Sequence, residues 1–370
     1  MPPSPLDFQE LVDHCITLLA EGDISILHRT RALVSCALVA RSWVDAAQAH
    51  LFRAPHRVTA DLWDSWDTRR PLLRLYRTLD TSPHLIRHVR DLNMSLTVDC
   101  ITRNATFFEF CHLPFLHLES ASIFLRRRLG HEFSMALQQL FSLPTLVYIK
   151  LDIWMENVST FSDMWKRCSP TIRHLDLTTD IDLSRTPDPD LDHVQLYPWA
   201  LYPFDLSHLK ALSIRDDMGV PWERFHVQTV QVLDVNATTE EGVVDLSLFP
   251  NLSHLRITPI ESVPPMVLET LCTITPSHHI QTIMIDLGYE VHCVEDDVDL
   301  GDETTCAPLD SKLCSLPMHL PPAVEFEVRL GSSTHEAARG FFPGLISQEM
   351  VHFVERRADT TWWEDLVHPL

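Results

Sequence analysis

A short apolar motif recurs along most of this 370-residue chain and limits the folds that it can adopt. Its first, fourth and sixth positions are apolar, and the positions between them are free. The motif occurs at Val89/Leu92/Met94, Leu113/Leu116/Leu118, Leu146/Ile149/Leu151, Ile172/Leu175/Leu177, Leu209/Leu212/Ile214, Val230/Leu233/Val235, Leu252/Leu255/Ile257, Ile280/Ile283/Ile285 and Ala323/Phe326/Val328. Successive copies lie roughly 20 to 45 residues apart, which is the range of repeat architectures. We therefore expect one structural unit to be stacked many times.

Each copy of the motif is predicted to be a short strand, because its apolar residues alternate with polar ones such as Lys150 and Asp176. Segments with helical spacing follow some of the strands, at residues 133–141, 161–168 and 267–272. Alternation leaves one face of the sheet open to water, whereas the strands of doubly wound sheets are buried on both faces. The predicted fold is therefore α/β, an open solenoid with a parallel sheet on its concave side and helices on the other.

The N-terminal residues have a different pattern, typical of three short helices. Apolar residues recur at helical spacing from Phe8 to Phe52, Glu21-Gly22-Asp23 breaks the first run, and Ser42 is placed to cap the third helix. Three helices in about 45 residues bury too little apolar surface to be stable alone, so this unit is expected to pack against a neighbouring part of the chain or a partner.

The domain boundaries follow from these changes of pattern. We expect an N-terminal domain at 1–55, a helical connector at 56–85 with leucines at helical spacing, and a solenoid with a C-terminal cap at 86–370. Two stretches interrupt the solenoid. Residues 178–204 combine aspartates with aromatic residues, and residues 290–303 are rich in acidic groups without lysine or arginine.

Composition and missing motifs exclude several classes of function. The formal net charge of −22 repels phosphate backbones and anionic membrane surfaces, and no apolar run is long enough to span a bilayer. The sequence has no glycine-rich phosphate loop, no G-x-S-x-G elbow, no H-E-x-x-H pair and no C-x-x-C pair. We expect no catalytic residues, no cofactor, no metal and no nucleic-acid or membrane partner. An enzyme with an unrecognised site remains an alternative.

The compartment is predicted from the N-terminus and the cysteines. Residues 1–10 have no basic or apolar stretch typical of a signal peptide. The nine cysteines are odd in number and scattered, unlike a secreted disulfide framework. We expect the chain to lie in the cytoplasm or the nucleus.

Residues 6–55 resemble an F-box, most specifically in Cys36-Ala37-Leu38-Val39-Ala40-Arg41-Ser42-Trp43 followed by Leu51-Phe52. Joined to irregular leucine-rich repeats, this domain makes the chain similar to the substrate receptors of Skp-cullin-F-box ubiquitin ligases. The asparagine that follows each strand in leucine-rich repeats is absent here, so other groups are expected to satisfy the turns.

The resemblance implies that the chain is not an enzyme itself and that its F-box docks on a Skp-type adaptor and, through it, on a cullin. The apolar residues expected to divide between the domain's own core and the adaptor are Leu11, Ile16, Leu19, Leu38, Val39, Trp43 and Leu51. The repeats would hold a protein substrate for ubiquitin-dependent degradation. A repeat scaffold that binds a partner outside any ligase is the main alternative.

The substrate is expected on the concave face, where side chains beside the inward apolar residues form a mixed aromatic and charged band. These residues are Phe115, His117, Tyr148, Lys150, His174, Asp176, His254 and Arg256. A solvated face without a ligand is the alternative. The aromatic stretch from Tyr197 to Phe204 and the tail around Trp362 and Trp363 are further candidate sites.

Overall fold

The computed structural model forms two compact parts, residues 1–172 and residues 173–370. It describes residues 5–22, 25–55, 69–96, 105–129, 131–155, 167–181, 207–216, 227–237, 243–259, 263–275, 279–286, 307–308, 310–311, 314, 325–330, 343–347 and 351–355. The predicted insertions at 178–204, beyond residue 181, and at 290–303 lie outside these residues, as do Trp362 and Trp363.

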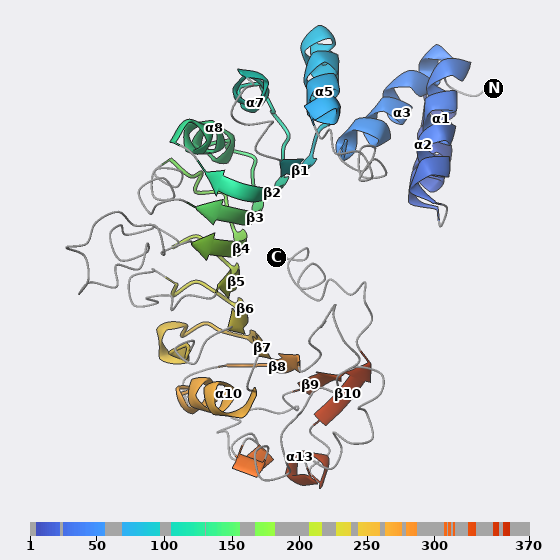
Figure 1. Ribbon diagram of the computed structural model, residues 1–370. Coiled ribbons are helices and arrows are strands. Elements are labelled where there is room, and N and C mark those ends of the chain that lie inside the picture. Colours follow the sequence, from blue (N-terminus) through green and yellow to red (C-terminus); the bar gives the residue numbers. More distant parts are fainter. Residues whose placement is uncertain are drawn as a thin grey trace, which may run out of the picture. The chain divides into compact units, whose positions relative to one another are not determined.

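The three predicted N-terminal helices are confirmed (Figure 1): α1 (Pro5–Glu21), α2 (Ile26–Val39) and α3 (Arg41–Arg53). Gly22 follows α1, where its N–H donates to the carbonyl of Leu18 at 3.0 Å. The prediction that Ser42 caps α3 is wrong. Ala40 has extended backbone and separates α2 from α3, so Ser42 already lies inside the first turn of α3.

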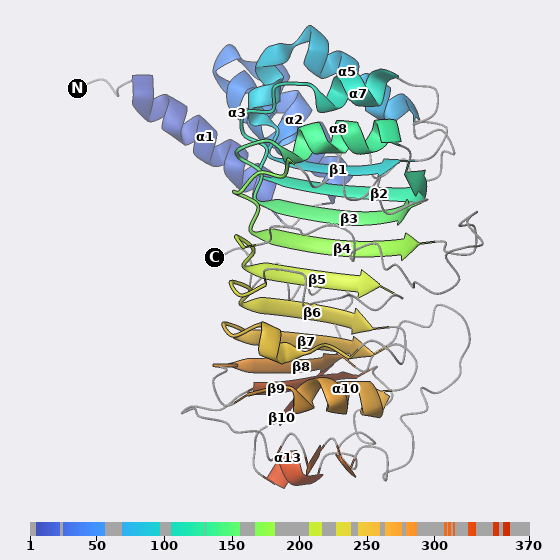
Figure 2. The same cartoon turned by 90° about the vertical axis from the view of Figure 1, so that its left-hand side faces the viewer.

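The rest of the N-terminal part combines helices with a parallel sheet. The helices α5 (Arg69–Thr81) and η2 (Pro83–His88) lie where the helical connector was predicted, and η2 extends three residues beyond it. Strands β1 (Asp91–Leu96), β2 (Ser120–Leu129) and β3 (Tyr148–Met155) pair in sequence order. Beside them lie α7 (Ala105–Cys111) and α8 (His131–Phe141), as Figure 2 shows. Phe107 of α7 stacks on Phe133 of α8 with ring centroids 4.4 Å apart.

The C-terminal part continues the same arrangement with strands that also pair in parallel and in sequence order. Its strands are β4 (His174–Ile181), β5 (Ala211–Asp216), β6 (Val232–Ala237), β7 (His254–Pro259), β8 (Thr282–Asp286), β9 (Glu325–Leu330) and β10 (Val351–Glu355). Its helices are η7 (Leu246–Leu248), α10 (Val263–Cys272) and α13 (Pro343–Ser347). The α/β class and the parallel sheet are therefore confirmed.

The apolar motif predicts β1 and β3 to β9 correctly and fails at β2. The predicted strand at Leu113/Leu116/Leu118 is a turn, and Leu116 is exposed. The strand starts at Ser120 instead, with Leu118, Ala121 and Ile123 buried. The motif of this strand is Leu118/Ala121/Ile123. Its middle position is alanine, which is a weaker signal for an apolar strand than a large side chain. No copy of the motif marked β10.

One face of the sheet is apolar throughout the described strands. Ala121, Ile149 and Leu151 are fully buried in the N-terminal part, and Leu233 and Leu255 are in the C-terminal part. On the opposite face, the described side chains of β1 to β3 are half-buried. The prediction of an open second face is wrong for much of β4 to β8, where Ala211, Val232 and Met284 among others are buried.

A repeated backbone contact joins each strand unit to the next. The carbonyl that precedes a strand by one residue accepts two N–H groups from the start of the following strand. The carbonyl of Lys210 accepts from Gln231 at 2.7 Å and from Val232 at 3.1 Å, and the carbonyl of Gln231 accepts from Ser253 and His254. Six such pairs are formed within the two parts, so the strands that they join start in the same register relative to their neighbours.

Side chains reinforce this edge of the sheet. Three residues before their strands, the Thr171 hydroxyl donates to Leu146 O at 2.9 Å, the Thr229 hydroxyl lies 2.8 Å from the carbonyls of Ser207 and Leu209, and the Asn251 amide donates to Gln228 O at 2.6 Å. These bonds link neighbouring units through residues that precede the strands, whereas the asparagine typical of leucine-rich repeats follows them. They lie at the start of each strand and not at its end.

Replacing Thr229 by valine keeps the side-chain volume but removes the hydroxyl at this edge. We expect Thr229→Val to lower the free energy of unfolding by about 1 to 2 kcal/mol, because partly buried carbonyls lose their donor. Urea unfolding followed by circular dichroism measures this change. Thr78→Val is the matched control, since Thr78 is exposed and its hydroxyl bonds only within α5. Equal losses in both variants would contradict the linking role of Thr229.

Candidate functional site

The three-helix unit, residues 5–53, has a small core of its own. Ile16 of α1, Leu33 of α2 and Ala47 of α3 are buried there, and each exposes no more than 3% of its surface. Partly buried residues that pack around these three are Val12, Leu19, Ala20, Cys36, Ala37, Trp43, Ala46 and Leu51. Several of them are small alanine or cysteine residues. Other large apolar side chains of the unit lie outside this core.

The apolar residues left outside form regular stripes on α1 and α2. On α2, Leu27, Val34 and Leu38 are exposed at spacings of seven and four residues, which places them on one face of the helix. We call this set the α2 stripe; it ends beside Val39, which is 69% exposed. On α1, Leu11 and Leu18 are exposed seven residues apart. Large apolar side chains exposed together on one helix face are typical of interaction sites.

The seven residues predicted to serve the core and the adaptor fall into exposed and packed groups in the structure. Leu11, Leu38 and Val39 are exposed, Leu38 at 83%. Ile16 is buried, and Leu19, Trp43 and Leu51 pack around the core. A partner role for Ile16 is therefore corrected, because its side chain has no surface to offer. The sequence-based predictions missed Leu18, Leu27 and Val34. Leu18 lies seven residues after Leu11, and Val34 lies seven after Leu27, which was a signal that could have found them.

The three-helix unit is attached to the start of β1 by a backbone hydrogen bond that resembles one of the two bonds joining the repeats. The carbonyl of Arg53, the last residue of α3, accepts the N–H of Arg90 at 3.0 Å, and Arg90 immediately precedes β1. The Arg53 side chain also lies 3.8 Å from the carboxylate of Asp91. The end of α3 thus occupies the position that a preceding repeat would take.

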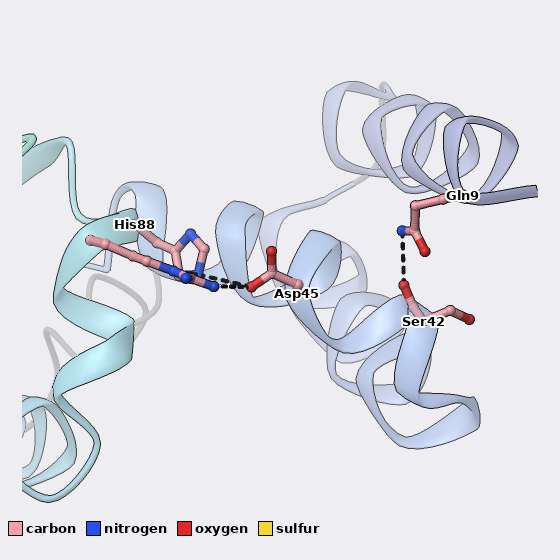
Figure 3. Close-up of polar contacts among 5 residues, drawn as sticks. Gln9, Ser42, Asp45 and His88 are labelled. Carbon is pink, nitrogen blue, oxygen red and sulfur yellow. Dashed lines mark hydrogen bonds and ion pairs between the residues drawn. The ribbon is translucent and has the colours of Figure 1, made fainter. Parts of the chain in front are cut away.

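A second contact pins α3 to η2. Asp45 forms an ion pair with Arg87 and lies 3.5 Å from Nε2 of His88, which Figure 3 shows. Burial lowers the pKa of His88, and Arg87 Nε donates to its Nε2 at 3.2 Å, which requires that nitrogen to be unprotonated. Figure 3 also shows the Gln9 amide of α1 donating to the carbonyl of Ser42 at 3.0 Å. The apolar stripes are therefore carried by an anchored unit.

The predicted substrate residues of the N-terminal part do not share one surface. Phe115 is a correction: it is buried, because its ring packs against that of Phe110 of α7 with the ring centroids 5.4 Å apart. His117 is exposed, but it lies in the turn before β2 and not on a strand. Tyr148 and Lys150 of β3 are half-buried and pair in register with Ser120 and Ser122 of β2.

In the C-terminal part the predicted substrate residues are largely enclosed. His174 and Asp176 are buried, which corrects their assignment to an open surface. Arg256 lies 3.6 Å from the carboxylate of buried Asp234, and Ser213 donates to the same carboxylate at 3.2 Å. These side chains satisfy one another because parallel pairing places them beside each other on neighbouring strands.

His254 and the cysteines complete the candidate groups. His254 is half-buried, its Nδ1 lies 2.8 Å from the Ser253 hydroxyl, and burial lowers its pKa. Burial raises the pKa of Cys111 and of Cys168, so neither thiol is a ready nucleophile. Among the described residues, no group of three or more His, Cys, Asp or Glu side chains could hold a metal ion. None of the described helices is long and apolar enough to cross a membrane.

Comparison of the sequence with protein-family models and with curated proteins found no match. The features that define a site are therefore those of the chain itself. The candidate site is the set of exposed apolar residues on the three-helix unit, namely the α2 stripe together with Leu11, Leu18 and Val39.

Leu33 and Leu38 lie on one helix and test the division between core and surface. We expect Leu33→Ala to lower the free energy of unfolding by about 2 to 5 kcal/mol, because it leaves a cavity in the small core. Leu38→Ala should change it by no more than about 0.5 kcal/mol, because the side chain is solvated. Thermal and urea unfolding of the two variants measure the difference. Similar losses in both would show that Leu38 is packed.

Proposed function

We propose that this chain is the substrate-recognition subunit of a Skp-cullin-F-box ubiquitin ligase. In this proposal the three-helix unit acts as the F-box and docks on the adaptor. The strand units act as an irregular leucine-rich-repeat solenoid that holds a protein substrate. The other subunits carry out ubiquitin transfer, so the chain itself contributes recognition and no catalytic group.

The observation that carries the proposal is the set of large apolar side chains that α1 and α2 leave in water. A unit of this size gains little stability from its own core, and exposing Leu38 and Val39 has no folding benefit. These two side chains lie in the segment of the sequence that most resembles an F-box. Docking on an apolar partner surface would remove them from water.

The anchoring of α3 supports the second half of the proposal. A substrate receptor has to hold its substrate at a defined position relative to the adaptor. Ion pairs from Asp45 and Arg53, together with the backbone bond to Arg90, tie the three-helix unit to the first strand. Such a connection gives adaptor and substrate a fixed relation, which a flexible linker would not.

The burial of Phe115, His174 and Asp176 narrows the substrate surface that we propose. In the N-terminal part, Tyr148 and Lys150 remain half-buried on the polar face of β3. An aromatic ring beside a flexible cation is typical of protein-binding hot spots. We therefore place part of the substrate contact on this face of β3.

The adaptor contact is tested with Leu38→Asp combined with Val39→Asp in the full chain. We expect binding to a purified Skp-type adaptor to fall at least about a hundredfold, since two carboxylates would have to be buried in an apolar interface. Isothermal titration calorimetry gives the affinities. Leu116→Asp is the control, because Leu116 is also apolar and exposed but lies outside the three-helix unit.

Two outcomes contradict this assignment. A parent chain that does not bind the adaptor would leave a repeat scaffold acting outside any ligase. An adaptor that binds the parent and both variants equally would place the contact elsewhere on the chain.

The substrate contact is tested with Tyr148→Ala combined with Lys150→Ala. Quantitative affinity purification should show a set of proteins that falls at least about tenfold with this variant while the adaptor stays constant. Leu38→Asp with Val39→Asp should show the reverse pattern. Loss of no protein in the Tyr148 and Lys150 variant would move the substrate away from this face of β3.

A further inference from the structure

The charge around the α2 stripe is opposite to that of the whole chain. The sequence carries 51 acidic and 29 basic side chains, yet residues 24–44 contain no aspartate or glutamate. The same stretch contains Arg29, Arg31 and Arg41. A helix that was merely a solvated surface of this protein would be expected to share its acidic character. The local excess of basic groups therefore needs a separate reason.

Arg31 lies within the apolar stripe itself. It is exposed and is four residues from Leu27, three from Val34 and seven from Leu38, so it is on the same helix face. Arg41 is also exposed, just beyond Val39. No described residue forms an ion pair with either guanidinium. Arg29 differs, because it is half-buried and donates to the carbonyl of Gly22 at 2.9 Å.

We infer that the α2 stripe binds an acidic protein surface, in which carboxylates border an apolar groove and contact Arg31 and Arg41. This inference rests on the proposed function, and it commits to the Skp-type adaptor as the occupant. Guanidinium groups form bidentate hydrogen bonds with carboxylates, so arginine here supplies orientation as well as charge. The apolar side chains supply burial, and Arg31 selects the partner.

Two other occupants would also offer negative charge. An anionic membrane suits a helix with apolar and basic residues, but the net charge of −22 opposes adsorption of the chain to such a surface. A second copy of this chain also carries a net charge of −22, so repulsion between the two copies opposes their association. A protein groove is favoured because Arg31 lies among the apolar residues of the α2 stripe, where one carboxylate bordered by apolar groups meets it better than a uniform charged plane.

The test compares Arg31→Glu, Arg41→Glu and Arg31→Lys with the parent, using the full chain and the purified Skp-type adaptor in surface plasmon resonance. We expect Arg31→Glu to weaken binding at least about tenfold and Arg41→Glu to weaken it less. Arg31→Lys should fall between the parent and Arg31→Glu, because lysine keeps the charge and loses the bidentate geometry. The ratio between the parent and Arg31→Glu should shrink as salt is raised, because screening weakens exposed charge pairs. Arg74→Glu, at an exposed arginine of α5, is the control and should bind like the parent.

Each contrary result has its own meaning. Equal binding by Arg31→Glu and the parent, with loss in the variant that carries Leu38→Asp and Val39→Asp, overturns the acidic surface and leaves the proposed function standing. Failure of the parent to bind the adaptor overturns both. A parent dimer in analytical ultracentrifugation that Arg31→Glu dissociates would make a second copy the occupant. Tighter binding of the parent to phosphatidylserine vesicles than to the adaptor would make it a membrane.

Discussion

The backbone contact between one strand and the next is the interaction on which the rest of this molecule depends. A single carbonyl, such as that of Lys210, accepts two N–H groups from the following strand and so sets both spacing and register. Buried backbone polar groups have to be paired, and this edge pairs them without regard to side-chain identity. The loops between strands can therefore differ widely in length while the strands themselves stay aligned.

A related backbone bond joins the N-terminal helices to the sheet. The carbonyl of Arg53 takes the place of a repeat that would precede β1, and the ion pairs of Asp45 and Asp91 hold it there. A terminal repeat needs a cover for its exposed edge. The three-helix unit supplies part of that cover with α3, which leaves the far sides of α1 and α2 available. Its anchoring and its exposed apolar stripes are thus two consequences of one placement.

The polar face of the C-terminal part shows how charged residues are tolerated inside such a fold. Asp234 accepts from Ser213 and pairs with Arg256, and all three lie on neighbouring strands in register. A buried ion pair of this kind contributes little net stability, because desolvation offsets the attraction. Its effect is on specificity, since a shift of register would leave a buried charge without its partner. A row that looks like a binding surface in the sequence is therefore part of the interior.

The local pattern of the sequence was sufficient for most of the elements. The alternating apolar motif predicts eight of the ten strands described, and the helical spacing predicts α1, α2, α3, α8 and α10. It failed at β2, where Ala121 replaces a large apolar residue, and at β10, where no motif was found. These successes have a common reason: the period of side chains along a strand or a helix is a property of the backbone alone.

Which apolar and polar residues are covered was decided only by the tertiary structure. Leu33 and Leu38 belong to one helix and are equally apolar, yet one is in the core and the other is in water, because only the packing of α1 and α3 defines which side of α2 is inside. Likewise Lys150 stays half-exposed while Asp176 is buried at the same position of its motif. Burial is set by neighbours that are distant in sequence, and no local period contains them. The sequence by itself therefore determined the repeated strands and the helices, and the assembled fold decided which residues a partner can reach.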